Sequence, residues 1–313
     1  MFDVFKNRLE LDGTLTTVTA LRISQGRSME PIGSDLPVVK DALGKPLIPG
    51  SSFKGAMRSR LESFMRGVDP DLAANPTIEA EWSITNERLN GKNGIKEEVA
   101  QELQQLYPDE AQRRERVGQR DTVLTRKILS ETDLVSQLFG SPWLSSKLQL
   151  RDLAVVPDSW FGQYQERDGV AINRDTETAA DGKLYDFQVV PAGTPFQFHA
   201  VVENAEEWEL GLLMIGLHQF ETEQIPLGGG RSRGLGVVKL ELNKKWWFDY
   251  PTHQPEQLIQ YLQHLIQNEK DHYLLTADDY DTYKTTWSEA LIAELRKPRE
   301  QRFGKSPVIT SAS

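Results

Sequence analysis

The chain has 313 residues, no cysteine and a formal net charge of -10. This length allows a sizeable core and predicts about two domains, or one domain with large insertions. Without cysteine there can be no disulfides or thiolate metal sites, which favours a reducing compartment. The sequence has no apolar run long enough to cross a membrane and does not open with a secretory leader pattern. We therefore expect a cytoplasmic protein without a membrane partner.

Positive charge is concentrated in two segments of this acidic chain. Residues 1–66 contain ten Lys and Arg against seven Asp and Glu, and residues 226–247 contain five against one. The local net charges are +3 and +4, so the remaining residues total -17. Phosphate binding depends on local potential rather than on overall charge. The distribution therefore predicts a focused groove for an anionic ligand.

The periodicity of the apolar residues predicts six core elements in the order strand, helix, strand, strand, helix, strand. Asn204 and Glu207 form a capping-box pattern in front of the second helix. This order is that of the ferredoxin-like split βαβ fold, which RNA-recognition motifs also use, so the fold class is α+β. In chain order, the expected elements lie at 13–24, 51–66, 148–156, 196–202, 204–215 and 238–242.

A core of this kind is far shorter than the chain, so other segments must account for the rest. We expect the core to occupy 1–248, with a helical insertion at about 67–140 and an extended hairpin at about 164–195. The hairpin has two extended arms and a polar tip that contains Asp181-Gly182. Residues 249–313 are expected to form a helical C-terminal extension.

Two apolar stripes predict the helices of the extension. Thr286 and Glu289 form a capping-box pattern that is expected to open the second helix. The first stripe consists of Leu258, Leu262, Leu265 and Ile266, and the second consists of Trp287, Leu291 and Leu295.

The first of two Gly-rich stretches lies at Gly50-Ser51-Ser52, where an N-cap is expected in front of a helix. Lys54 and Arg58 follow, four residues apart on one face. A helix N-terminus with bare N–H groups beside two cations suits a phosphate, although an ordinary amphipathic helix with solvated cations has the same pattern. The expected buried stripe of this helix is Phe53, Met57, Leu61, Phe64 and Met65.

The second Gly-rich stretch, residues 227–236, precedes the last predicted strand. Its glycines lack the Rossmann spacing, since Arg233 stands where that motif requires glycine. Glycines permit close backbone approach, and Arg231 and Arg233 can clamp phosphates. A plain flexible connection would need neither arginine, so ligand binding is favoured here.

Both stretches resemble motifs of the RAMP superfamily of CRISPR proteins. The resembling residues are Pro49–Gly55 and Gly228–Gly236. Ser34–Asp41 is similar to a segment of the repeated backbone subunit of type III effector complexes. Gly169–Val190 resembles the thumb hairpin of that subunit, and Leu138–Ser141 matches a further family segment. The motifs occur in the family's order, which makes them more specific together than any one is alone.

The resemblance covers roughly residues 10–245. It implies that the partners of the protein are CRISPR guide RNA, complementary target RNA and other type III effector subunits. It implies that the thumb pushes through the guide–target duplex and flips out a base at regular intervals. The RNA-binding residues expected on this basis are Gly50, Ser51, Ser52, Lys54, Arg58, Asn173, Arg174, Gly229, Gly230, Arg231, Ser232 and Arg233.

The resemblance also implies that Asp35 supports cleavage of target RNA with a divalent cation, for which Mg²⁺ is expected. A single carboxylate can hold a metal or orient the attacking 2′-hydroxyl, but it does not supply an acid–base pair. From the residues alone, Asp35 is a loop residue, and Asp41 is expected to form the turn into Gly44. A scaffold subunit that binds guide RNA without cutting is therefore an open alternative.

Histidine and cysteine positions bear on two further possibilities. A metal-independent RNA-processing ribonuclease usually needs a histidine as its general acid–base. No histidine lies in the Gly-rich stretches or beside Asp35. Many relatives carry a zinc site in the insertion, built from Cys and His. Residues 67–150 contain neither, so no such zinc site is expected and other interactions must stabilise the insertion.

Overall fold

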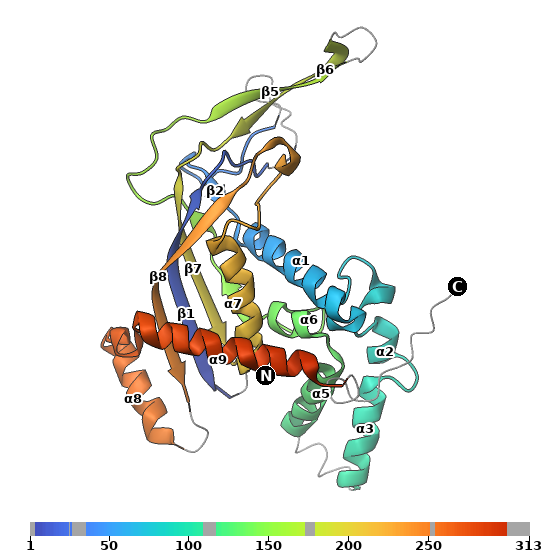
Figure 1. Ribbon diagram of the computed structural model, residues 1–313. Helices are drawn as coiled ribbons and strands as arrows, with labels where there is room; N and C mark the ends of the chain where they lie inside the picture. The colour runs from blue at the N-terminus through green and yellow to red at the C-terminus, as the bar shows by residue number, and fades with distance from the viewer. Residues whose placement is uncertain are drawn as a thin grey trace.

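The computed structural model describes residues 4–24, 26, 36–108, 117–172, 179–250 and 254–298. Within them, the expected ferredoxin-like α+β arrangement is confirmed (Figure 1). The main sheet has the order β3-β7-β1-β8, and every neighbouring pair is antiparallel. Its strands are β1 (Asn7–Thr17), β3 (Leu148–Leu150), β7 (Pro195–Glu203) and β8 (Val238–Asp249).

Two helices, α1 (Gly50–Val68) and α7 (Glu207–Glu221), cover one face of this sheet and form the main core with it. Side chains alternate along a strand, so Leu9, Leu11 and Leu15 of β1 all point to the helical face and are fully buried. The Phe53 ring of α1 stacks on Phe220 of α7 with centroids 4.1 Å apart. Truncating such a buried phenylalanine to alanine typically costs about 3–5 kcal/mol of stability.

Three local expectations about the core elements are wrong. The first strand begins at Asn7 and ends at Thr17, instead of spanning 13–24. The segment 148–156 divides into β3 and β4 (Leu153–Ala154), and β4 pairs with β2 (Leu47–Ile48) in a separate sheet. In α1, Phe64 is 38% exposed and so lies outside the buried stripe.

The capping box of α7 lies two residues later than expected. Glu206 is the N-cap residue and Glu209 completes the box. Asn204 is used elsewhere, because its side-chain oxygen accepts a hydrogen bond from the Lys6 backbone N–H at 2.7 Å and its amide donates to the Val4 carbonyl at 2.8 Å. The asparagine thus attaches the chain's first described residues to the end of β7.

The insertion has its own small core and an ion-pair network. Arg88 contacts Glu98 at 2.6 Å and Glu131 at 2.5 Å, and Lys127 also pairs with Glu98. These interactions stabilise the insertion within the described residues. Its elements are η1 (Pro70–Leu72), η2 (Glu79–Glu81), α2 (Asn86–Asn90), α3 (Ile95–Leu106), α5 (Val117–Glu131) and α6 (Leu134–Phe139). Its buried apolar residues are Ile84, Leu89, Ile95, Val99, Leu103, Ile128 and Leu144.

The segment expected to form the thumb is an antiparallel hairpin of β5 (Gln165–Ile172) and β6 (Ala179–Val189), which projects from the core in Figure 1. Asp181-Gly182, expected at the tip, is part of β6 instead. The root of the hairpin is packed into the protein, since Phe187 and Val189 form a buried cluster with Ala20 and Leu235.

The C-terminal extension packs on both faces of the sheet. It consists of α8 (Pro255–Ile266), η4 (Lys270–Tyr273) and α9 (Ala277–Arg296). Helix α9 packs on α7 through the buried Trp287 and Leu291. Helix α8 lies on the opposite face, where Tyr261 stacks on Phe248 of β8 with centroids 4.0 Å apart. Neither α9 nor any other helix in the described part of the chain has the length and apolar character of a membrane span.

Two expectations about the extension are wrong. The stripe of Leu262, Leu265 and Ile266 is exposed, and Tyr261 is the buried residue of α8. Helix α9 begins after Thr276, whose hydroxyl accepts a hydrogen bond from the Asp279 N–H, so the expected cap at Thr286 lies inside the helix.

Candidate nucleic-acid interface

The two Gly-rich stretches meet in one groove on the surface. The groove has a volume of about 580 Å³ and lies between α1 and the segment that follows α7. The contributing residues of α1 have small side chains, apart from one arginine. The groove is lined by Ser51, Ser52, Gly55, Ala56, Ser59, Arg60, Ser63, Ile225, Pro226, Gly228 and Arg231.

A strip of small residues forms the α1 side of this groove. Ser51, Gly55, Ser59 and Ser63 recur every four residues, which places them on one face of the helix, and all four are exposed. A Cβ atom at Gly55 would meet nothing within 4 Å. Glycine inside a helix costs about 0.5–1 kcal/mol relative to alanine, so internal packing does not account for it here. The strip leaves room for a ligand backbone to approach the helix.

The other wall is a loop that backbone hydrogen bonds attach to the segment around Arg22. Gly228 has φ of +72°, and a Cβ atom there would lie 2.0 Å from the Arg22 carbonyl oxygen. The Gly229 N–H donates to that same carbonyl at 2.8 Å. The loop then forms one 3-10 turn, η3 (Arg231–Arg233), whose three residues are exposed. Two cations and a hydroxyl are thereby presented beside the groove.

The start of α1 differs from the expected cap. The N-cap residue is Pro49, no side chain caps the helix, and Gly50, Ser51 and Ser52 form its first turn. The Gly50 N–H donates to the Asp152 carboxylate at 2.8 Å, so an internal anion already occupies part of this terminus. A Cβ atom at Gly50 would lie 2.8 Å from the Arg151 carbonyl oxygen. Gly50 therefore permits close packing, while Ser51 and Ser52 line the groove.

Lys54 is not brought into the groove. Its ammonium donates to Ser146 Oγ at 2.6 Å and to the Leu148 carbonyl at 3.0 Å. Burial lowers the pKa of Lys54 to about 8, and the charge of Arg58 adds to this shift. Lys54 therefore joins α1 to the segment between the insertion and β3, and its contact with RNA stays a prediction.

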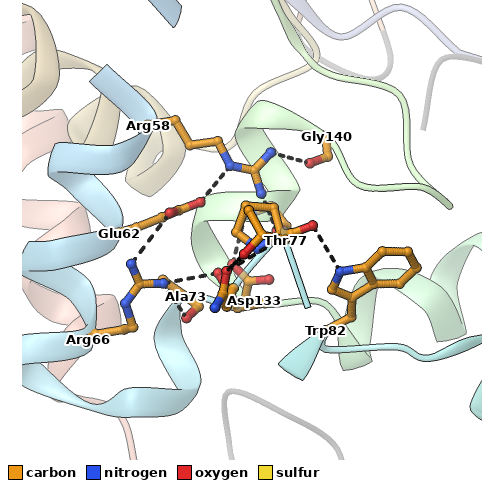
Figure 2. Close-up of polar contacts among 12 residues, drawn as sticks. Arg58, Glu62, Arg66, Ala73, Thr77, Trp82, Asp133 and Gly140 are labelled. Carbon is orange, nitrogen blue, oxygen red and sulfur yellow. Dashed lines mark hydrogen bonds and ion pairs between the residues drawn. The ribbon is translucent and has the colours of Figure 1, made fainter. Parts of the chain in front are cut away.

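Arg58 likewise faces the insertion. Figure 2 shows its guanidinium between Glu62, which accepts from Nε at 2.7 Å, and the Gly140 carbonyl, which accepts from Nη1 at 3.0 Å. Nη2 donates to Ser136 Oγ at 3.1 Å. These contacts connect α1 to α6 and direct Arg58 away from the groove. RNA contact by Arg58 therefore also stays a prediction.

Sequence reasoning missed Arg60 as a groove cation. Arg60 lines the groove and donates from Nη2 to the Gln224 carbonyl at 3.0 Å. Its position beside the small residues at 59 and 63 could have indicated in the sequence that Arg60 borders a groove. The four-residue repeat of small side chains marks the open face of α1, whereas the expected cations Lys54 and Arg58 lie on a different face.

The surroundings of the remaining expected residues are partly described. Asp35, Asn173 and Arg174 lie outside the described residues. Leu36, which follows Asp35 in the sequence, donates its N–H to the Asp186 carbonyl at 3.2 Å and accepts from the Gln188 N–H at 3.1 Å. Leu36 therefore lies at the thumb root.

The expected turn at Asp41 is confirmed. Its carboxylate accepts hydrogen bonds from the N–H groups of Leu43 and Lys45, each at 2.9 Å. The Gly44 N–H donates to the Asp41 carbonyl at 3.1 Å. Asp41 thus stabilises its own loop.

The family model of the RAMP superfamily matches residues 14–239, which is more than half of the chain. The chain belongs to the RAMP superfamily. The match runs from β1 to the start of β8 and includes both walls of the groove. Within this RAMP protein, α8, η4 and α9 follow the matched region.

This RAMP protein is similar to several proteins named "CRISPR system Cms endoribonuclease Csm3". It is 23% identical to the one from Enterococcus italicus over 239 residues, which cover 76% of this chain and 91% of that relative. The Streptococcus thermophilus protein is 24% identical over 239 residues, covering 75% and 87%. The Mycobacterium tuberculosis protein is 46% identical over 95 residues, which span only 39% of its length. The expected resemblance is confirmed.

Proposed function

We propose that this protein is a guide-RNA-binding backbone subunit of a type III CRISPR effector complex and that it cleaves target RNA. The observation that carries the proposal is the single groove formed by two Gly-rich stretches far apart in the sequence. The names of the similar proteins, which are CRISPR endoribonucleases, support the same function.

The chemistry of the groove suits a phosphate backbone. Its polar lining consists of serine hydroxyls and the guanidinium groups of Arg60 and Arg231. These groups recognise phosphate and sugar oxygens, and such contacts position a strand without reading its sequence. A guide-binding subunit must accept many guide sequences, so backbone contacts are the required kind.

Target cleavage is assigned to Asp35 with a divalent cation. In the thumb strands, Asp168 and Asp186 are direct cross-strand partners, and both are exposed. Carboxylate oxygens are the donors that Mg²⁺ prefers, which supports this assignment. Asp35 would hold the ion. A bound ion would supply charge stabilisation at the scissile phosphate.

Crosslinking tests the groove assignment. The protein is assembled with its partner subunits and a guide RNA containing 4-thiouridine, irradiated, digested and analysed by mass spectrometry. We expect crosslinked peptides from residues 51–63 and 225–233. Crosslinks confined to the opposite sheet face, around Trp246 and Phe248, would refute the groove. Sequencing of the RNA in the purified complex identifies the guide.

A further inference from the structure

We propose that His264, Glu269 and His272 form a binding site for a zinc ion in the C-terminal extension. One ligand atom from each of the three residues lies within 4.8 Å of the other two. None of them belongs to the groove or to the thumb. The site would add a bound metal ion to a part of the chain that follows the matched RAMP region.

The local backbone brings these side chains together. His264 lies in the last turn of α8, and the Glu269 N–H donates to its carbonyl oxygen at 2.8 Å. Asn268, with φ of +57°, turns the chain between them, and η4 follows with His272. The two imidazole rings stack with centroids 4.3 Å apart, and His272 Nε2 lies 3.7 Å from Glu269 Oε2, so the exposed His272 ring must turn for both histidines to direct a nitrogen at one ion.

Tyr273 orients His264 as a supporting residue does in known metal sites. The Tyr273 hydroxyl lies 2.9 Å from His264 Nδ1. With a metal on Nε2, the ring keeps its proton on Nδ1 and donates it to the tyrosine oxygen. Tyr273 is itself held by edge-on contacts with Phe248 at 5.1 Å and Tyr261 at 5.2 Å. The sheet therefore supports the position of this ligand.

The donor types select the class of metal. Two imidazoles and one carboxylate suit zinc, whereas magnesium and calcium prefer oxygen ligands. Zinc commonly accepts three protein ligands with water in the fourth position. Glu269 and His272 are exposed, so an ion can enter from solvent.

A second group with suitable donors, Glu10, Asp12 and His199 on the open sheet face, is a poorer candidate. Cations already neutralise Glu10, because Lys270 contacts it at 2.9 Å and Arg8 contacts it at 3.4 Å. The Lys270 ammonium also lies 3.8 Å from the Trp246 ring centroid, so this η4 cation is directed toward the sheet. The His264 group therefore carries the proposal.

The zinc ion would join the end of α8 to η4. Helix α8 buries only Tyr261 among the residues of its span, so apolar packing holds it weakly. The 3-10 turn is attached to β8, since Trp246 Nε1 donates to the Asp271 carboxylate at 3.0 Å. Metal binding thus holds α8 on the sheet face.

The test uses the full chain, stripped with a chelator and then titrated with Zn²⁺, or with Co²⁺ as a spectroscopic probe. We expect one metal per chain and visible Co²⁺ absorption bands. Both should be lost in His264→Gln and His272→Gln, and zinc affinity should fall about 10–100-fold in Tyr273→Phe. His218→Gln is the control, because His218 is an exposed histidine 3.0 Å from Glu221 on α7.

Hydrogen exchange supplies an independent readout. Zn²⁺ should slow amide exchange over residues 255–266 in the wild-type chain and leave the His264→Gln exchange unchanged. Circular dichroism verifies that the variants are folded. The proposal is overturned if the wild type fails to bind zinc stoichiometrically. It is also overturned if the His264→Gln/His272→Gln double variant binds zinc as the wild type does.

Discussion

The Arg60 guanidinium donates a hydrogen bond to the Gln224 carbonyl at 3.0 Å, which joins helix α1 to the segment leading into the Gly-rich loop. This contact connects the two walls of the groove. It also leaves a positive charge at the groove, where serine hydroxyls and Arg231 complete a lining suited to phosphates. The groove is therefore a preformed feature of the chain.

Replacing Arg231 and Arg233 with alanine should weaken RNA binding similarly for all sequences. Each lost phosphate contact should reduce the slope of log affinity against log salt by about 1. The measurement is fluorescence anisotropy with unrelated single-stranded RNAs at several salt concentrations. Lys239→Ala, which removes an exposed cation of β8 outside the groove, is the control. An unchanged slope in the double variant would place the phosphate contacts elsewhere.

Asp35→Ala should abolish target cleavage at this subunit's positions while target binding survives. One carboxylate contributes little to a large phosphate-dominated interface, but it is needed to hold the cation. Asp35→Asn should be nearly as inactive, because it keeps the shape and loses the charge. The assay follows end-labelled target RNA in the assembled complex with and without Mg²⁺. Undiminished cutting would favour the scaffold function.

Glu98→Gln should lower the stability of the insertion at neutral pH and leave it unchanged in strong acid. The hydrogen bond from Arg88 is the main cause that lowers the pKa of Glu98 to about 2. A carboxyl with a lowered pKa stabilises the fold above its usual value of about 4.5, and this contribution is lost as the pH falls toward 2. Thermal unfolding of the wild type and Glu98→Gln should show a smaller difference in Tm at pH 3 than at pH 6. Glu102→Gln is the control, and a constant difference would contradict the assignment.

Gly211→Ala should loosen the C-terminal extension. A Cβ atom at Gly211 would lie 2.1 Å from the Trp287 carbonyl oxygen, so α9 would have to move away from α7. Overpacking of this kind costs about 1–3 kcal/mol. Urea unfolding measures the loss, and Gly118→Ala is the matched control because a Cβ atom there meets nothing within 4 Å. Equal stability of Gly211→Ala and wild type would show that the contact is unimportant.

The core could be predicted because its signals are local. Phe53, Met57 and Leu61 share one helix face whatever the rest of the chain does, and all three are fully buried. The alternation of Phe196, Phe198 and Ala200 similarly marks the strand β7. Such periodicities depend only on the geometry of helix and strand.

The extension could not be predicted to the same depth, because an amphipathic helix does not reveal its partner. The aliphatic stripe of α8 predicted the buried face, but the structure buries Tyr261 against the Phe248 ring instead. Stacked aromatic rings gain energy beyond the buried area, so they can decide which face packs. Ile266, at 83% exposure, lies on the open side.

Only part of the candidate site could be predicted, because some of the expected residues have partners that are distant in the sequence. Both Gly-rich stretches contribute to the groove, but Lys54 and Arg58 donate to residues 136–148, which lie in and just after the insertion. Such tertiary partners leave no periodic signal. The strip of Ser51, Gly55, Ser59 and Ser63 did have a period, but small residues are also common at packing interfaces.

The Gly55→Leu substitution tests the groove most directly. Leucine there would place its Cβ where nothing lies within 4 Å, at a residue that lines the groove, so the fold should be retained or gain about 0.5–1 kcal/mol from the lost helix glycine. Gly67→Leu is the matched control, since Gly67 is also an unobstructed glycine of α1 and does not line the groove. We predict that guide-RNA affinity, measured by anisotropy, falls at least about tenfold in Gly55→Leu, equivalent to about 1.4 kcal/mol, and is unchanged in Gly67→Leu. Wild-type affinity in a folded Gly55→Leu protein would contradict guide binding in this groove.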